Sequence, residues 1–204
     1  MDPGRKPAEL LAFIGVGAGA KVADLAAGDG YTSELVARAV GPTGVVYAEN
    51  PKWLVEKFVA EPWAKRLATA ANKNVVRLDR ELEDPLPPEA HDLDVVVMNL
   101  FYHDLYWTDV DRAKMNAAVM KALRPGGLYI VIDHSAKDGA GTNEVKELHR
   151  IEEKVVRADI EAAGFKLAGT SDFLRNPADK RDWFVFEDGK RGTTDRFALK
   201  YKKP

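Results

Sequence analysis

The chain has 204 residues, of which 46% are hydrophobic, and its 30 basic and 32 acidic side chains give a formal charge of -2. This length supports one well-filled core and is short for two, so we expect a single domain over residues 1–204, with 1–20 as an amino-terminal cap and 21–204 as the core. The charges are spread along the whole chain, so nucleic acid is not expected as a partner. The absence of cysteine excludes disulfides, thiolate zinc sites and cysteine nucleophiles.

Hydropathy predicts no membrane segment. The apolar stretches are far shorter than the roughly 20 residues that a membrane span needs. Residues 1–6 also lack the apolar core of a signal peptide. A cytoplasmic location follows if Met1 is the natural start, and an exported form follows if a signal peptide was removed before it.

Short apolar runs rich in Val, Ile and Tyr alternate with segments of helical period. This alternation is typical of an α/β fold in which helices cover both faces of a mostly parallel sheet. Seven strands are expected, over residues 21–26, 45–48, 75–78, 94–100, 128–132, from 165 onward, and 196–201. The last of these alternates like an edge strand.

Helices are expected between these strands and at the amino terminus, over residues 8–14. Pro62 must break or kink the helical stretch after the second strand, because proline lacks the N–H that a helix interior needs, so two short helices are expected there. The helix after the fourth strand ends at Arg124-Pro125-Gly126-Gly127, and residues 143–163 are expected to form one helix that stops at Gly164.

The most informative segment is a turn between the first strand and the next helix, where Asp24 ends the strand and Gly28 and Gly30 open the helix. Only glycine allows a ligand to approach the backbone so closely, and a carboxylate complements an ammonium group. A nicotinamide-binding domain also has a glycine turn here, but with the spacing G-x-G-x-x-G. Gly30 is followed by Tyr-Thr-Ser, so the third glycine is missing.

This turn, together with Pro-Gly-Gly before the fifth strand, resembles the motifs of class I S-adenosylmethionine-dependent methyltransferases. The resemblance implies a three-layer Rossmann-like fold with a seven-stranded, mostly parallel sheet and an antiparallel last strand. It also implies S-adenosylmethionine as the cofactor, with the amino-terminal helix across the cofactor mouth. Asp24 would lie beside the cofactor's amino group, and Gly28 and Gly30 beside its methionine part, with Ala26 replacing the usual first glycine.

The same resemblance assigns the rest of the cofactor site. Asn50 occupies the place of the acidic residue that binds the ribose hydroxyls, and Glu49 just before it is the alternative. Glu81 is a candidate for the exocyclic amine of adenine and Leu82 for its ring. Asn99, at the end of the fourth strand, completes the predicted cofactor-binding set.

Two histidines fall at the sheet edge where ligands bind in doubly wound folds, because they follow the fourth and fifth strands. A base is needed only if the methyl acceptor arrives protonated, and His103 or His134 could then remove the proton, with Asp133 or Asp104 orienting an imidazole. His149 is placed in the expected helix over 143–163, with a structural role at least as well supported. His91 is expected to be exposed.

A metal-dependent mechanism is the alternative reading of Asp133, His134 and His103. Their spacing forms no compact ligand motif, so no metal is expected. The aromatic residues that follow the fourth strand either wall an acceptor pocket or pack against the domain: Phe101, Tyr102, Tyr106 and Trp107.

Three functions remain open. A methyltransferase for a small molecule is favoured by the size of the chain. A methyltransferase acting on protein or nucleic acid would call for a basic face or an Asn-Pro-Pro-Tyr-like sequence, and Asn99-Leu100-Phe101-Tyr102 lacks both prolines. A non-catalytic protein that binds S-adenosylmethionine would have the same glycine turn. Oligomeric state has no signature in the sequence.

Overall fold

The computed structural model describes residues 2–204, and it contains one seven-stranded sheet with the order β3-β2-β1-β4-β5-β7-β6. β7 is antiparallel to β5 and β6, and the other pairings are parallel. The expected fold class is therefore confirmed, including the antiparallel last strand. The strands are β1 Lys21–Leu25, β2 Val45–Asn50, β3 Val75–Asp79, β4 Leu93–Asn99, β5 Leu123–His134, β6 Lys166–Ser171 and β7 Arg196–Lys202.

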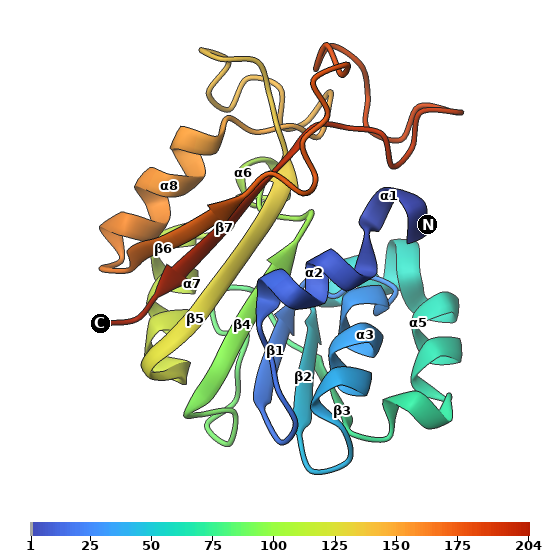
Figure 1. Ribbon diagram of the computed structural model, residues 1–204, viewed down its shortest axis with the longest axis vertical. Helices are drawn as coiled ribbons and strands as arrows, with labels where there is room; N and C mark the ends of the chain where they lie inside the picture. The colour runs from blue at the N-terminus through green and yellow to red at the C-terminus, as the bar shows by residue number, and fades with distance from the viewer. Residues whose placement is uncertain (1) are drawn as a thin grey trace.

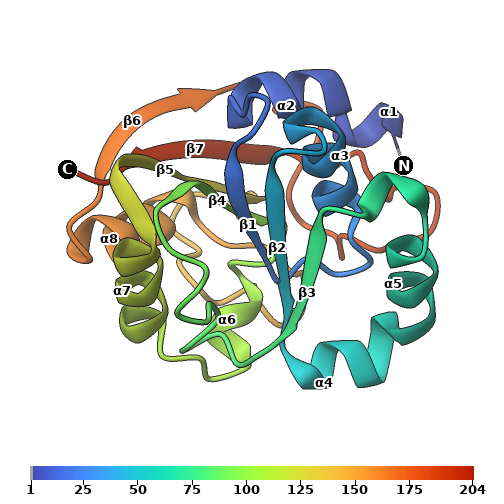
Figure 2. The same ribbon diagram turned by 90° about the horizontal axis from the view of Figure 1, so that it is seen from below.

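Helices cover both faces of this sheet (Figure 2). Two of them, α2 and α3, pack on one face through an apolar cluster that includes Ile14, Val36 and Ile130. On the other face α7 and α8 pack through Met115 and Val156. The helical segments are α1 Asp2–Arg5, α2 Pro7–Ile14, α3 Tyr31–Val40, α4 Lys52–Leu54, the π-helical turn η1 Val55–Val59, α5 Ala60–Leu67, the 3-10 turn η2 Ala70–Asn72, α6 Asp104–Trp107, α7 Arg112–Ala122 and α8 Glu153–Ala162.

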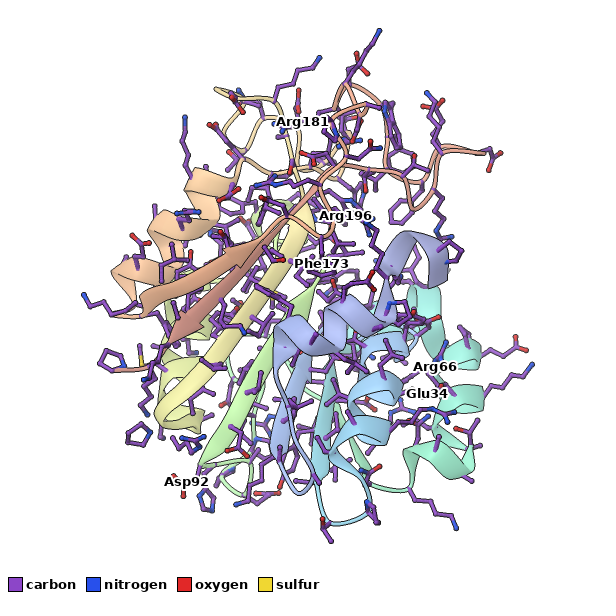
Figure 3. All side chains as sticks on the ribbon, in the orientation of Figure 1. Glu34, Arg66, Asp92, Phe173, Arg181 and Arg196 are labelled. Atoms are coloured by element: carbon purple, nitrogen blue, oxygen red, sulfur yellow. The ribbon has the colours of Figure 1, made fainter. Side chains whose placement is uncertain are left out.

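The helical stretch after β2 is distorted rather than broken: α4, η1 and α5 follow one another without a gap, and Val59 just before α5 has φ of -126°. Pro62 lies in the first turn of α5, where its missing N–H costs no helical hydrogen bond. Arg66 of α5 then donates to Glu34 of α3 at 2.7 Å, and Figure 3 shows the two side chains facing each other between the helices.

The single helix expected over residues 143–163 is wrong in its first half. Residues 141–148 form turns, and α8 begins only at Glu153. Arg150 is the cause, because its buried guanidinium donates to the carbonyl of Ser135 and pairs with buried Asp179 at 2.9 Å. His149 consequently has φ of 53°, which no helix accommodates. Tertiary contacts therefore override the helical period of this segment.

Two loops and α1 lie above the carboxyl ends of the parallel strands, where Figure 1 shows residues 135–152 and 172–195 at the same end of the molecule, with α1 next to the second of these loops. Figure 3 places Arg181 and Arg196 at this end of the molecule and Asp92 at the opposite end. None of the described helices is long and apolar enough to cross a membrane.

Gly30 provides a test of this packing. A Cβ there would lie 2.2 Å from the ring of Trp63, and φ is 80°. Gly30→Ala should lower the free energy of unfolding by about 3 kcal/mol in chemical denaturation, through both the clash and the left-handed backbone.

Gly139 is the matched control, because its φ is 86° and no atom lies within 4 Å of an added Cβ. Gly139→Ala should cost only about 1 kcal/mol. Equal losses in the two variants would contradict the contact between Gly30 and Trp63.

Candidate functional site

The turn between β1 and α3 exposes its backbone at one position. Ala26, Gly28 and Gly30 all have positive φ, of 50°, 62° and 80°. A Cβ on Gly28 would meet nothing within 4 Å, whereas one on Gly30 would strike Trp63. Gly28 thus leaves open space for a ligand beside the main chain, and Gly30 allows close packing of α5.

The end of β2 holds this turn in place. The Asn50 amide accepts from the Gly28 N–H at 2.8 Å and donates to the Gly28 carbonyl at 3.0 Å. Both ends of that amide are therefore engaged. Glu49 accepts from the Ala26 N–H at 3.0 Å through Oε2, but its buried Oε1 has no partner within the described part of the chain.

Glu49 is thus the residue at the end of β2 with an oxygen to spare. Burial raises the pKa of its carboxyl well above the usual range, and the Ala26 hydrogen bond only partly offsets this. Hydroxyls of a ribose diol would provide partners for such a group, and this fits the cofactor that the sequence implies.

Asp24 is fully enclosed at the end of β1. Its carboxylate accepts from the Ser33 hydroxyl at 2.6 Å. Burial raises the pKa of Asp24 to about 7, against the effect of that hydrogen bond and of the positive charge on Arg5. A bound ammonium group would favour the ionised form, so Asp24 fits the role that the resemblance implies.

The remaining cofactor candidates differ in their surroundings. Asn99 donates to the Thr32 hydroxyl at 3.0 Å and so links the end of β4 to α3. Leu82 is buried in the core, whereas Glu81 is exposed. The role of both in adenine binding stays a prediction.

His103 lies in a buried hydrogen-bond network at the ends of β4 and β5. Asp133 accepts from its backbone N–H and from its Nδ1, each at 2.7 Å. Its Nε2 lies 3.1 Å from both Asp104 Oδ1 and His149 Nδ1. Burial lowers the pKa of His103, but the charges of Asp133 and Asp104 outweigh burial and raise it to about 10. His103 is thus an imidazolium between two carboxylates at neutral pH.

His134 is neutral, whereas His103 is charged, although the centres of the two rings are only 5.9 Å apart. Its Nδ1 lies 2.8 Å from the Thr194 hydroxyl. Burial, followed by the charge of His103, holds the pKa of His134 well below its usual range. The sequence offered His103 and His134 as equivalent candidates for the base. In the structure His103 is a cation and His134 is a neutral imidazole.

The ring nitrogens of His103 and His149 and a carboxylate oxygen of Asp104 could hold a metal ion, since they lie within 4.8 Å of one another. Asp133 and His134, which the sequence considered for that role, are not in this group. The hydrogen bonds among the three side chains account for their arrangement. Sequence reasoning missed the contribution of His149 because it placed that residue in a helix.

A cavity of about 570 Å³ opens beside His134 and Leu100, at the carboxyl ends of β5 and β4. Several further residues of its lining come from α1 and from the loop before β7: Arg5, Val185, Phe186, Arg191 and Arg196. Sequence reasoning assigned none of these five to a site, because the two segments that carry them lie about 180 residues apart in the chain.

A cluster of aromatic rings around His149 adjoins the cavity through Phe186, which belongs to both. Trp107, Phe184 and Phe186 each lie within 6.0 Å of the His149 ring, measured between centroids. Trp107, Phe184 and Phe186 are also among the more exposed large apolar side chains of the described residues. Phe101, Tyr102 and Tyr106, in contrast, pack into or against the core.

No protein-family model and no curated protein matches this chain. Solved structures do. A SAM-dependent methyltransferase from Aquifex aeolicus superposes with a TM-score of 0.70 at 20% identity, over 97% of this chain and 89% of that one. A chain from the complex of the Haloferax volcanii Trm112 methyltransferase activator gives 0.67 at 19%, over 100% and 91%. The [4+2]-cyclase SpnF gives 0.70 at 14%, over 98% and 80%.

These likenesses extend over almost the whole chain at low identity, so they concern the fold. The chain has the Rossmann-like fold of the class I SAM-dependent methyltransferases.

Proposed function

We propose that the protein is an S-adenosylmethionine-dependent methyltransferase. The observation that carries the proposal is the open backbone at Gly28, flanked by the buried carboxyls of Asp24 and Glu49. The ammonium group of the cofactor would pair with the Asp24 carboxylate. Its ribose diol would hydrogen-bond to the free oxygen of Glu49. The cavity beside His134 and Leu100 lies at the same carboxyl end of the strands as the turn. It adjoins β4, which pairs with β1.

The bound cofactor would supply a methyl group on a sulfonium, and the protein would align it with the acceptor and exclude water. Leu100 directly follows β4 and has a φ of 63°. The apolar residues of the lining, Leu100, Val185 and Phe186, would enclose the acceptor without reacting with it.

We propose His134 as the base where the acceptor carries a hydroxyl. It lines the cavity and is neutral, so it is able to accept a proton. His103 is already protonated, so its role is to position the network and, through its charge, to tune His134. Asp133 orients His103 and accepts from the His134 backbone N–H at 2.7 Å. The reaction needs no metal in this scheme.

A small acceptor fits best, because the cavity is of the size that small-molecule sites have. The complex of the Trm112 activator with a putative methyltransferase favours a second candidate, a methyltransferase that works together with a partner protein. SpnF, a cyclase, favours a third, in which the fold does not transfer a methyl group. Turnover of S-adenosylmethionine with a small acceptor and the isolated chain would exclude both alternatives.

Asp24→Ala should weaken S-adenosylmethionine binding at least tenfold in calorimetry, because it leaves the ammonium unpaired. In the unsubstituted protein, affinity should rise as pH rises from about 6 to about 7.5, because Asp24 ionises in that range and the ligand's amino group is still largely protonated.

Asp94→Ala is the control for this measurement. Asp94 is the second residue of β4, at the end of the strand away from the turn, and it pairs with Arg124 at 2.7 Å. Its substitution should leave affinity and its pH dependence unchanged. Undiminished affinity in Asp24→Ala would refute the assignment of the turn.

The histidine charge states can be measured by NMR titration. The His103 ring should remain protonated to about pH 10, and the His134 ring should stay neutral well below pH 6.5. Asp133→Asn should lower the pKa of His103, because it removes one of the two negative charges that raise it. Equal titration of His103 and His134 would contradict their separate roles.

A further inference from the structure

We propose that the cavity beside His134 binds the acidic group of the methyl acceptor, a carboxylate or a phosphate, through Arg5, Arg191 and Arg196. This inference rests on the proposed function, because it names the class of acceptor for that same site. The acceptor would combine an anionic group with an apolar or aromatic body.

The charged side chains in the cavity lining are all positive. Three guanidinium groups line the cavity, and no aspartate or glutamate among the described residues does so. Over the whole protein, basic and acidic residues are almost balanced. A concentration of one sign in a concave site attracts ligands of the opposite sign.

These arginines have no carboxylate partner within ion-pair distance in the part of the chain that the structure describes. Most other arginines do, including Arg66, Arg150 and Arg175. The nearby Asp195 is already paired, because Arg181 lies 2.8 Å from it and Arg175 lies 3.5 Å from it. A positive charge enclosed without a counter-ion is costly, and a bound anion would offset that cost.

Arg196 is the clearest case of an enclosed positive charge. It is only 4% exposed, and it donates to the carbonyls of Gly4, Gly192 and Thr194. Burial, followed by the charge of Arg5, lowers the pKa of Arg196 to about 10. Burial lowers the pKa of Arg5 as well. Both groups would gain from a negative charge between them.

The rest of the lining defines the body of the ligand. Leu100, Val185 and Phe186 are apolar, and the Arg191 guanidinium lies 5.2 Å from the centre of the Phe186 ring. The neutral His134 stands at the same cavity, ready to accept a hydroxyl proton. An aromatic or aliphatic hydroxy acid meets all three features.

Anion binding would also act on the base. The charges of Arg196 and Arg5 help to lower the pKa of His134. A carboxylate beside them would offset that influence and make His134 a stronger base when acceptor is present. This coupling gives a readout that does not require turnover.

The experiment uses protein saturated with S-adenosylhomocysteine and three probes: 4-hydroxybenzoate, its neutral analogue 4-hydroxybenzamide, and inorganic phosphate. Calorimetry should show a Kd of about 1 mM for 4-hydroxybenzoate or phosphate, and at least tenfold weaker binding of the amide. In NMR, the bound anion should raise the pKa of His134. Absence of binding by both anions at about 10 mM would overturn the proposal.

Arg191→Met should weaken anion binding about tenfold, because it removes one of the three positive charges that line the cavity. Arg191 is exposed, and its side chain forms no ion pair with the described residues, so the fold should tolerate the substitution. Lys190→Met is the matched control, because it removes the same charge from the neighbouring residue, which pairs with Glu187 outside the lining. Equal effects of the two variants would mean general charge attraction and would contradict a built site.

The carboxylate of the cofactor is the other source of an anion, and a second arm separates it. If Arg191→Met and Arg5→Met weaken S-adenosylhomocysteine binding but leave the probes unaffected, the arginines serve the cofactor and the proposal is wrong. If S-adenosylhomocysteine fails to bind the unsubstituted protein, the proposed function fails, and probe binding to the free protein still decides the nature of the cavity.

Discussion

The carboxylate of Asp133 joins the two segments on which the acceptor side of the molecule depends. It is fully buried and accepts three hydrogen bonds, from the backbone and ring of His103 and from the backbone of His134. A buried carboxylate needs such partners, so the chain after β4 is held against the end of β5. The same charge keeps His103 protonated, and His103 in turn helps to keep His134 neutral. One interaction thus sets both the position and the protonation of the site.

A second buried charge pair fixes the loops above the sheet. Arg150 and Asp179 are both excluded from solvent, and Arg150 also donates to the carbonyls of Ser135 and Trp183. These contacts tie the segment after β5 to the long loop before β7. That loop carries Phe186, Arg191 and the start of β7 to the cavity. Loops bearing functional groups over a rigid sheet are the usual arrangement in doubly wound folds.

Much of this could be predicted from local sequence. Strand periodicity gave the seven strands, and Asp24, Gly28 and Gly30 marked the turn, because these signals lie within a few neighbouring residues. The division of roles between Glu49 and Asn50 could not be predicted, because it depends on which side chain bends back to Gly28. The prediction of a helix across His149 was wrong for a similar reason. The contacts of Arg150 with its distant partner Asp179 hold the backbone of this segment in a non-helical conformation. Arg5, Arg191 and Arg196 meet only after folding, so spacing carried no sign of a cationic cavity.

The central claim is that the turn after β1 binds an adenosyl cofactor, and calorimetry with S-adenosylmethionine, S-adenosylhomocysteine and NAD, side by side on the purified protein, tests it most directly. The account predicts dissociation constants in the micromolar range, on the order of -8 kcal/mol, for the two adenosyl ligands and no measurable binding of NAD. Binding of NAD in place of the other two would contradict it.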